Sequence, residues 1–371
     1  MSDVTELWRS ERLMAAMYDA GVKHDRVAMV GAWAMWGADM RRMFADVARL
    51  ADVSIGTASK ALNAGGRLSK DTREKVIRVA REIGYRPNDL AQSLHRAKSR
   101  TIGIISNDSF GRFTFPIVEA LEERLAEAGI AVFMCNATDD PERERQHLDQ
   151  LLGKRIDGLV VTARRADKRV PIGPLAPSLP VIYVFSQAED PRALSLLPDD
   201  EGGAVLAVAH LASLGRKRIA HVTGPEHFEA VRLRRNGYRS ALAEAGLPEI
   251  EGSYLSGVWS EAWGREAVAK LLSGPQKPDA IFCGNDQIAR GATDILREMG
   301  LAVPTDVAIV GFDNWDVMVH ASRPQLTSVD MNLKALGREA GDSLLEMISG
   351  KKVSGVRRRP CSLMIRTSSK A

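Results

Sequence analysis

The sequence predicts an all-α helix-turn-helix headpiece followed by an α/β body of two lobes, each a doubly wound parallel sheet. Residues 43–100 contain 12 Lys/Arg against 6 Asp/Glu, whereas the whole 371-residue chain has a formal net charge of only +4, so the remainder carries about −2. After residue 100, short β-rich apolar runs such as "TIGIIS", "GLVVT" and "VAIVGF" alternate with helical stretches. That alternation is typical of βα units with parallel strands. A small basic module therefore precedes a near-neutral body.

The headpiece prediction begins at Phe44, with "FADVARLADVSIGTASKALN". The apolar face of a first helix comprises Val47, Ala48 and Leu50, and residues 51–54 form a tight break. The apolar face of a second helix comprises Thr57, Ala58, Ala61 and Leu62. Ser54 is placed to cap the second helix. Because a helix that enters a DNA major groove about 12 Å wide needs a slim leading edge, small side chains suit this position.

A third helix is predicted in "SKDTREKVIRVAREIGY", where Ser69 starts the helix. Its apolar stripe comprises Val76, Ile77, Ala80 and Ile83. Pro87 ends this segment, and about two turns of a short helix bearing Leu90, Ala91 and Leu94 are expected to follow. So short a helix is marginal by itself, and a plain linker is the alternative interpretation.

Composition excludes several classes of protein. With 45% hydrophobic and 26% charged residues the chain is neither disordered nor membrane-like, and no apolar run reaches the roughly 18 residues of a spanning helix. Cys135, Cys283 and Cys361 form no disulfide framework and lack metal-ligand spacing. We therefore expect a reducing, cytoplasmic location, and neither a metal nor a cofactor.

Residues 1–42 are the least informative part of the sequence. "RVAMVGAWAMW", residues 26–36, combines a positive charge with an apolar run, as a signal-peptide core does. Its flanks do not resemble a cleavage site, and export would remove a nucleic-acid-binding module from the cell, so we reject that interpretation. Two remain open: a poorly ordered extension with short helical pieces, or a mis-assigned start, in which Met40 or Met43 begins the functional protein.

Several motifs resemble one known family. "DVARLADVSIGTASKALN", "SKDTREKVIRVAREIGYRPN" and "LAQSL" resemble the headpiece and hinge of the lactose-repressor (LacI/GalR) family of bacterial transcription regulators. The resemblance continues through "CNATDDPERERQHLDQLLGKRIDGLVV", "AHLASLGRKRIAHVTGP", "RRNGYRSALAEAGL", "FCGNDQIARGA", "DVAIVGFDN" and "LTSVDMN", and spans residues 44–366. It implies a body of the periplasmic-binding-protein-like type that forms a homodimer and binds a small-molecule effector between its lobes, and a headpiece that binds palindromic operator DNA.

The resemblance also sets the expected domain boundaries. These are 1–42 for the extension, 43–86 for the DNA-binding headpiece, 87–100 for a hinge helix and linker, and 101–371 for the effector-binding and dimerisation body. The lobes are expected to exchange chain near Pro198, Asp330 and Pro360. The N-lobe then comprises about 101–197 and 331–359, and the C-lobe about 198–330 and 360–371. No heptad repeat follows "MIRTSSKA", so we expect dimers and not a coiled-coil tetramer.

The expected DNA contacts fall in two groups. On the second helix, the residues expected to face base edges are Ile55, Gly56 and Lys60. Those expected to hold phosphates are Ser54, Thr57 and Asn63. In the hinge, the expected contacts are Asn88, Ala91, Leu94 and His95. There the Leu94 side chain is expected to wedge into the central base step from the minor groove.

The expected effector site combines positions at strand ends with positions that the resemblance singles out. Its residues are Asn107, Asp108, Phe110, Thr162, Phe185, Arg234, Trp259, Asn285 and Asp313. The planar guanidinium of Arg234 can donate two parallel hydrogen bonds to vicinal hydroxyls or to a carboxylate. The alternative interpretation for Asp108 and Asn285 is that they only cap helices. For Trp259 it is that the side chain only packs in the core. Phe185 stands where many relatives carry an aspartate, so a plain copy of the usual sugar pocket is not expected.

These observations predict a sequence-specific DNA-binding transcriptional regulator, a repressor, whose operator affinity is controlled by a carbohydrate-like ligand: a sugar, polyol or sugar acid, with a purine as second choice. A doubly wound enzyme is one alternative. However, the sequence contains no P-loop, nucleophile elbow, H-E-x-x-H motif or dinucleotide signature, and its seven histidines are dispersed. An exported-type sugar-binding protein is the other alternative, and the basic headpiece argues against it. We expect no membrane association.

Overall fold

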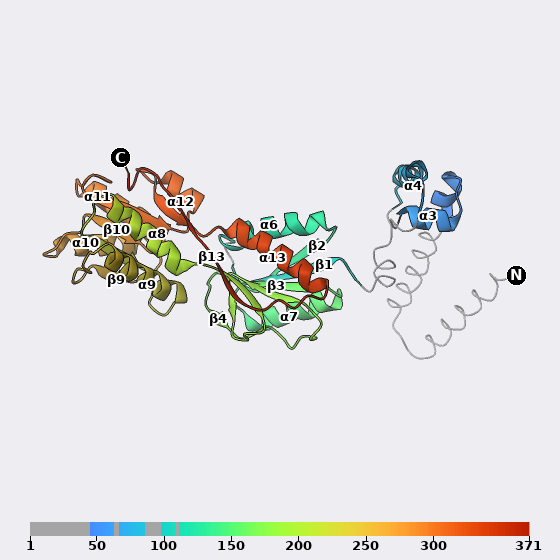
Figure 1. Ribbon diagram of the computed structural model, residues 1–371, viewed down its shortest axis with the longest axis horizontal. Helices are drawn as coiled ribbons and strands as arrows, with labels where there is room; N and C mark the ends of the chain where they lie inside the picture. Colours follow the sequence, from blue (N-terminus) through green and yellow to red (C-terminus); the bar gives the residue numbers. More distant parts are fainter. Residues whose placement is uncertain (1–44, 63–66, 86–97, 109–110, 371) are drawn as a thin grey trace, which may run out of the picture. The chain divides into compact units, whose positions relative to one another are not determined.

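The computed structural model describes residues 45–62, 67–85, 98–108 and 111–370 (Figure 1). The chain divides into two compact units, Met1–Arg96 and Ala97–Ala371, and each is described by itself below. In the described part of the chain, no helix combines the length and the apolar character needed to cross a membrane.

The first unit contains the predicted helix-turn-helix. Residues 45–50 are helical, residues 51–54 form a turn in which Asp52 has a φ of 52°, and α3 (Ile55–Leu62) and α4 (Lys70–Glu82) follow. The Ser54 Oγ accepts a hydrogen bond from the Thr57 amide at 3.1 Å, and the Ser69 Oγ accepts one from the Thr72 amide at 3.1 Å. Both predicted helix caps are therefore confirmed.

The core of this unit consists of small and branched apolar side chains. Its buried members are Val47, Ala48, Ala51, Ala58, Ala61, Val76 and Ala80. The prediction for Leu50 was wrong, because its side chain is 49% exposed. At about 100° per residue, Val47, Ala48 and Ala51 share one helical face and Leu50 falls well to one side of it. Ile83 is only half-buried and packs against this core, and Ile77 is also only half-buried.

The second unit contains two six-stranded sheets, which define two lobes (Figure 1). The N-lobe sheet has the order β13-β7-β5-β3-β1-β2, with all strands parallel. Its strands are β1 (Thr101–Ser106), β2 (Ala131–Asn136), β3 (Gly158–Thr162), β5 (Val181–Val184), β7 (Leu194–Pro198) and β13 (Gly355–Arg359). Its helices are α6 (Thr114–Glu127), α7 (Pro141–Gly153) and α13 (Leu333–Ile348). A separate two-stranded sheet consists of β4 (Lys168–Arg169), which follows β3 in the chain, and β6 (Gln187–Ala188), which follows β5.

The C-lobe sheet has the order β14-β12-β11-β10-β8-β9, and within it β14 runs antiparallel to β12. Its strands are β8 (Ile219–Thr223), β9 (Tyr254–Ser256), β10 (Ala280–Cys283), β11 (Ala308–Phe312), β12 (Thr327–Asp330) and β14 (Ser362–Met364). Its helices are α8 (Asp200–Ser213), α9 (Glu229–Glu244), α10 (Glu261–Ser273), α11 (Asp286–Glu298) and α12 (Asp316–Ala321). The predicted fold class, two doubly wound parallel sheets after an all-α headpiece, is confirmed.

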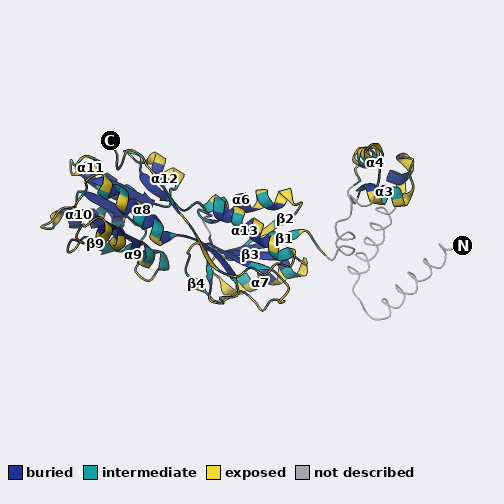
Figure 2. Cartoon of the chain, in the orientation of Figure 1, coloured by how far each residue is buried: buried dark blue, intermediate teal, exposed yellow. Residues whose placement is uncertain are grey.

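The central strands of both sheets are buried, as the continuous apolar runs in the sequence require (Figure 2). The main hydrophobic cluster extends through both lobes, from Ile102 on β1 to Phe282 on β10. Neighbouring helices on the sheets pack closely against each other where one of them has a glycine at the contact. A Cβ on Gly237 would lie 2.2 Å from the Glu201 carbonyl oxygen, so α9 can approach α8 only because this residue lacks a side chain.

Three segments carry the chain between the two sheets. They lie between β7 and α8, between β12 and α13, and between β13 and β14. Hydrogen bonds tie them to one another: the Asp199 amide donates to the Arg359 carbonyl at 2.8 Å, and the Asn332 side-chain amide donates to the Pro360 carbonyl at 2.9 Å. The lobes are therefore connected through one bundle of short crossing segments.

The contact at Gly237 gives a stability prediction. Gly237→Ala places a methyl group against the α8 backbone, which cannot move as a flexible side chain can, so we expect a loss of about 1–3 kcal/mol. Gly153→Ala is the matched control, because nothing lies within 4 Å of its added Cβ and alanine is the better helix former. Urea unfolding followed by circular dichroism measures both. Equal midpoints for the two variants would contradict the close approach of α8 and α9.

Candidate functional site

The start and outer surface of α3 expose one apolar side chain together with small and polar residues. Ile55 is 59% exposed, and Ser54, Gly56 and Lys60 are also exposed, whereas Thr57 is half-buried. The Ser54 and Thr57 hydroxyls lie 2.9 Å apart, so the cap itself orders the start of the helix. An apolar side chain as exposed as Ile55 makes little contribution to the headpiece core, and it is free to contact another molecule.

The other end of α3 is fixed by α4. The Arg73 guanidinium donates to the Ala61 carbonyl at 3.5 Å, one of the carbonyls at the end of α3 that has no partner within the helix. Six of the residues predicted from the sequence lie outside the described residues: Asn63, Asn88, Ala91, Leu94, His95 and Phe110.

In the body, the predicted effector residues come from both lobes. Asn107 and Asp108 follow β1, Thr162 ends β3 and Phe185 follows β5 in the N-lobe. The C-lobe residues are Arg234 on α9, Trp259 between β9 and α10, Asn285 at the start of α11, and Asp313 after β11. Except for Arg234, which lies within a helix, these residues are at or after the carboxyl ends of strands, where doubly wound folds bind ligands.

Arg234 is the most tightly held of these residues. It is only 4% exposed, and its Nε and Nη2 donate to the Asp200 Oδ1 at 2.8 and 2.6 Å. Its Nη1 donates to the Gly284 carbonyl, and its guanidinium lies 3.6 Å from the ring centroid of Phe312. Its Nη2 also lies 3.9 Å from an Asp313 carboxylate oxygen. Arg234 thus joins α8, α9, β10 and β11 in one buried polar cluster.

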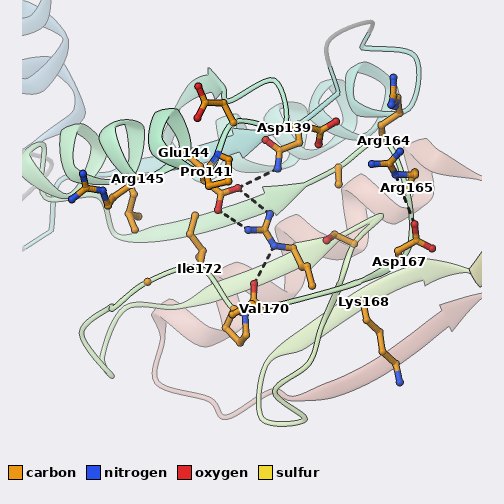
Figure 3. A pocket seen from close by; sticks show the side chains of 18 residues that line it. Asp139, Pro141, Glu144, Arg145, Arg164, Arg165, Asp167, Lys168, Val170 and Ile172 are labelled. Carbon is orange, nitrogen blue, oxygen red and sulfur yellow. Dashed lines mark hydrogen bonds and ion pairs between the residues drawn. The ribbon is translucent and has the colours of Figure 1, made fainter. Parts of the chain in front are cut away.

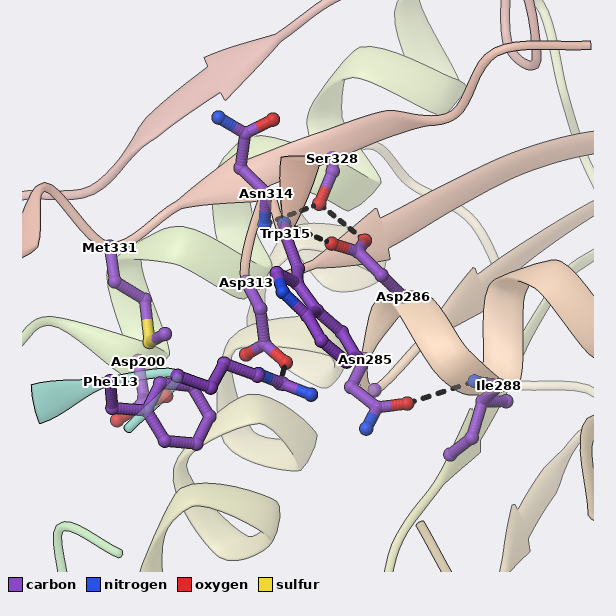
Figure 4. A network of polar contacts seen from close by, with 12 residues as sticks. Phe113, Asp200, Asn285, Asp286, Ile288, Asp313, Asn314, Trp315, Ser328 and Met331 are labelled. Atoms are coloured by element: carbon purple, nitrogen blue, oxygen red, sulfur yellow. Dashed lines mark hydrogen bonds and ion pairs between the residues drawn. The ribbon is translucent and has the colours of Figure 1, made fainter. Parts of the chain in front are cut away.

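Asp313 is shared between the lobes. Besides Arg234, it forms an ion pair with Arg112, which comes from the β1–α6 segment of the N-lobe. The Arg112 guanidinium lies 4.4 Å from the ring of Phe113 and 4.7 Å from the ring of Trp315. Figure 4 shows Asp313 among Phe113, Trp315 and Asn285. Burial lowers the pKa of Arg112 to about 10, which leaves it charged at neutral pH.

Five buried side-chain oxygens near the carboxyl ends of strands have no hydrogen-bond partner among the described residues. They are the Asn107 Oδ1, Asp108 Oδ1, Thr162 Oγ1, Thr223 Oγ1 and Asp313 Oδ2, the last of which has only its ion pair with Arg112. Because a buried polar atom without a partner costs about 1–3 kcal/mol, such a group of orphaned acceptors indicates a place for a ligand or for water. Thr223, at the end of β8, was not predicted from the sequence.

Helix capping, the alternative role considered for Asp108 and Asn285, is observed for both. The Asp108 Oδ2 accepts from the Phe113 and Thr114 amides at 3.1 and 3.2 Å, and the Asn285 Oδ1 accepts from the Ile288 amide at 2.9 Å. Capping engages one oxygen of each side chain, which leaves the other polar atom able to face a ligand.

The aromatic residues have mixed environments. Trp259 packs against the C-lobe core, where a Cβ on Gly224 would lie 2.2 Å from its ring, and it stacks on Phe228 at 6.5 Å. Phe185 is buried, and its ring stacks on that of Phe113 at 4.7 Å. Phe185, directly after β5, therefore adds an apolar side chain near Arg112, which packs on the same Phe113 ring.

Next to this cluster, Asp286 fixes the loop that carries Trp315. Its two carboxylate oxygens accept from the Ser328 hydroxyl at 2.6 Å and from the Trp315 amide at 2.7 Å. Complete burial raises the pKa of Asp286 to about 7, although the two hydrogen bonds and Arg112 act in the opposite direction.

A separate cavity of about 630 Å³ opens in the N-lobe, lined by residues that follow β1, β2, β3 and β5 (Figure 3). Within it, Arg169 makes a bidentate ion pair with Glu144 at 2.6 and 3.0 Å, and Glu144 also accepts from Asn107. Of the predicted effector residues that the structure describes, only Asn107 lines this cavity. Two ion pairs, Arg169 with Glu144 and Arg165 with Asp167, lie within this cavity. Because it contains only one predicted effector residue, we place the candidate ligand site at the Asp313 cluster instead.

Comparison with known proteins agrees with both parts of the structure. The model for bacterial regulatory proteins of the lacI family matches residues 44–88, and a periplasmic binding protein-like domain matches residues 208–369. The HTH-type transcriptional repressor PurR of Haemophilus influenzae (strain PittEE) is 34% identical over 311 residues, which cover 82% of this chain and 91% of that protein. The chain belongs to the LacI family of bacterial regulatory proteins.

Other LacI-family proteins show the same similarity. The HTH-type transcriptional repressor CytR of Escherichia coli (strain K12) is 33% identical over 328 residues, covering 88% of this chain and 96% of that protein. The solved structure of the lac repressor dimer bound to operator and the anti-inducer ONPF matches with a TM-score of 0.70 and 29% identity, over 88% of this chain and 98% of that one. The family resemblance predicted from the sequence is confirmed.

Sequence reasoning missed Arg112, Asp200 and Trp315, which complete the cluster around Asp313 in this LacI-family body. Arg112 follows a segment whose residue spacing matches no ligand-binding motif. Asp200 is an acidic residue in the first turn of α8, a common position that does not by itself indicate a site. A signal was present in "GRF", an arginine next to an aromatic residue just after the first strand, because that pairing favours cation–π stacking.

The environment of Asp286 predicts a pH dependence. Its folded-state pKa of about 7 lies above the ordinary value of 3.8, so between these pH values the folded state holds a proton that the unfolded state has lost. The contribution of Asp286 to the free energy of unfolding therefore falls as pH rises from about 4 to 7, by up to about 1.4 kcal/mol per pH unit. Urea unfolding at pH 5, 6, 7 and 8 of the parent and Asp286→Asn measures this contribution as their difference. A difference that does not change with pH would contradict it.

Proposed function

We propose that this LacI-family protein is a sequence-specific DNA-binding transcriptional repressor whose affinity for operator DNA is controlled by a small ligand bound between the two lobes of its body. The observation that carries the proposal is the exposed leading surface of α3, formed by Ile55, Gly56 and Lys60 on an ordered, capped helix. The names of the relatives PurR and CytR, both transcriptional repressors, support it.

The proposed roles on α3 follow from side-chain chemistry. Lys60 donates to guanine O6 and N7, Ile55 contacts a thymine methyl group, and the absent side chain of Gly56 allows close approach. The exposed first turn, with Ser54 and Thr57, lies against phosphate and fixes the register, because free amides at a helix start attract anions. Asn63 adds a further phosphate contact in this proposal.

The hinge and domain boundaries are part of the same proposal. Residues 43–86 form the headpiece and 87–100 the hinge, where Leu94 wedges into the central base step. The flanking hinge contacts are Asn88, Ala91 and His95. In the body, the N-lobe and C-lobe boundaries expected near Pro198, Asp330 and Pro360 place the ligand next to the crossing segments. A ligand that favours one lobe arrangement then changes DNA affinity by the same factor by which DNA changes ligand affinity.

The proposed ligand is a sugar, polyol or sugar acid. Its hydroxyls would meet the orphaned oxygens of Asn107, Asp108, Thr162 and Thr223, and the carboxylate of Asp313. Most donors of Arg234 are engaged by Asp200 and Gly284, so in this proposal Arg234 holds Asp313 in position and does not itself bind the ligand. The remaining proposed contacts are Phe110, Phe185, Trp259 and Asn285.

The proposal for groove reading is tested with Lys60→Ala. We expect the variant to lose discrimination at one base pair of each half-site, by roughly 1–3 kcal/mol, while other positions keep their ranking. The measurement is a gel shift against a set of single-base operator variants at fixed salt. Lys75→Ala, which removes an exposed lysine from α4, is the matched control and leaves the ranking of all variants unchanged. The same result for both variants would remove Lys60 from base readout.

A dimer on a palindrome is the second testable element, because one helix-turn-helix unit reads too few base pairs to specify a genomic site. We expect sedimentation velocity at micromolar protein to give a dimer, and two chains per operator duplex. A monomer that binds one chain per duplex with full specificity would overturn this element. The affinity for DNA is also expected to fall steeply with salt.

A further inference from the structure

Arg112 places a fixed positive charge beside Asp313, at the candidate ligand site, that the family resemblance did not predict. We propose that the ligand of this protein is an anion, a sugar acid or similar carboxylate, whose carboxylate pairs with Arg112 in the place now taken by Asp313. The inference rests on the proposed function, since it names the chemical class of the ligand at the same site.

The position of Arg112 is set by packing against two aromatic rings. Its guanidinium carbon lies 4.4 Å from the ring centroid of Phe113 and 4.7 Å from that of Trp315, and its side chain is only 14% exposed. Phe185 stacks on Phe113 and Asp286 holds the Trp315 amide, so both rings are themselves supported. Because aromatic rings engage a face of a guanidinium, its N–H edge is the part that can bind a charged partner.

That edge is only partly used. One terminal nitrogen, Nη2, pairs with the Asp313 Oδ2, while the buried Nε has no hydrogen-bond partner among the described residues. Nε and Nη2 of a guanidinium point the same way and together match the two oxygens of a carboxylate. Arg112 therefore has two adjacent donors, Nε and Nη2, and Asp313 engages only Nη2.

The two members of this ion pair are not equally replaceable. Asp313 has a second cation nearby, because the Arg234 Nη2 lies 3.9 Å from its Oδ1. Within the part of the chain that the structure describes, Arg112 has no second carboxylate within ion-pair distance. The carboxylates of Asp108 and Asp286 are near enough to act on it electrostatically, but backbone amides hold them in place.

A ligand that takes the place of Asp313 beside Arg112 separates Arg112 from its counterion. A buried guanidinium without a counterion is strongly unfavourable, and hydroxyl groups satisfy its N–H donors but not its charge. A carboxylate on the same ligand restores both the charge pair and the two-pronged hydrogen bonding. Asp313 meanwhile keeps Arg234 and gains the ligand hydroxyls, so each charged group retains a partner.

The test compares matched acids and neutral sugars on the full-length protein. Galacturonate with galactose, glucuronate with glucose, and gluconate with sorbitol are each titrated by isothermal calorimetry, after a thermal-shift comparison at millimolar concentration. We expect at least one acid to bind at least about tenfold more tightly than its neutral counterpart. In Arg112→Gln that preference disappears. In Arg112→Lys, which keeps the charge but not the planar fork, part of it remains.

Arg265→Gln is the matched control, because it removes the same charge from an exposed pair with Glu298, and it keeps the parent's affinities. Circular dichroism of Arg112→Gln and Arg112→Lys verifies that both variants fold. The proposal is overturned if no acid in the panel binds, if a neutral sugar binds as tightly as its acid, or if Arg112→Gln binds the acid as the parent does.

A gel shift with operator DNA, with and without each compound, separates this inference from the proposed function. If a neutral sugar changes DNA affinity and no acid does, the ligand-controlled regulator stands and the anionic ligand class is wrong. If an acid binds through Arg112 but leaves DNA affinity unchanged, the ligand class stands and the proposed control of DNA binding is wrong.

Discussion

The buried ion pair between Arg234 and Asp200 is the interaction on which the body depends. Asp200 begins α8, directly after the first segment that crosses between the sheets, and Arg234 lies on α9. Through Gly284 and Asp313 the same guanidinium reaches the ends of β10 and β11. Since removing one partner of a buried pair leaves an uncompensated charge, the arrangement of these elements is specified by one side chain.

That constraint also explains why the candidate ligand site lies where it does. Helix α9 holds Arg234 behind the carboxyl ends of the C-lobe strands, and Arg234 in turn orients Asp313 toward the N-lobe. Asp313 has a φ of 101°, an uncommon conformation for a residue with a side chain, which this double pairing stabilises. The polar groups of the candidate ligand site are thus held before a ligand arrives, which reduces the entropy lost on binding.

The headpiece follows a different physical rule. It buries mostly alanine and valine, because three short helices can pack closely only around small side chains. The starts of α3 and α4 are set by local serine caps. Ile55 and Lys60 are left to solvent because the core is already complete without them. A unit stabilised in this way can keep its fold while the residues on the outer surface of α3 are used for recognition.

The sequence by itself determined what depends on local chemistry: the caps at Ser54 and Ser69, the helix-turn-helix, the alternation of βα units and the family. These follow from periodicity and short-range hydrogen bonding, which a sequence shows directly. The tertiary structure alone decided that Arg112 joins Asp313 and Arg234, both expected in the effector site, in one cluster. Arg112 and Asp313 are separated by about 200 residues, and no periodicity relates them. Their contact exists only because two sheets built from interleaved segments bring their strand ends together.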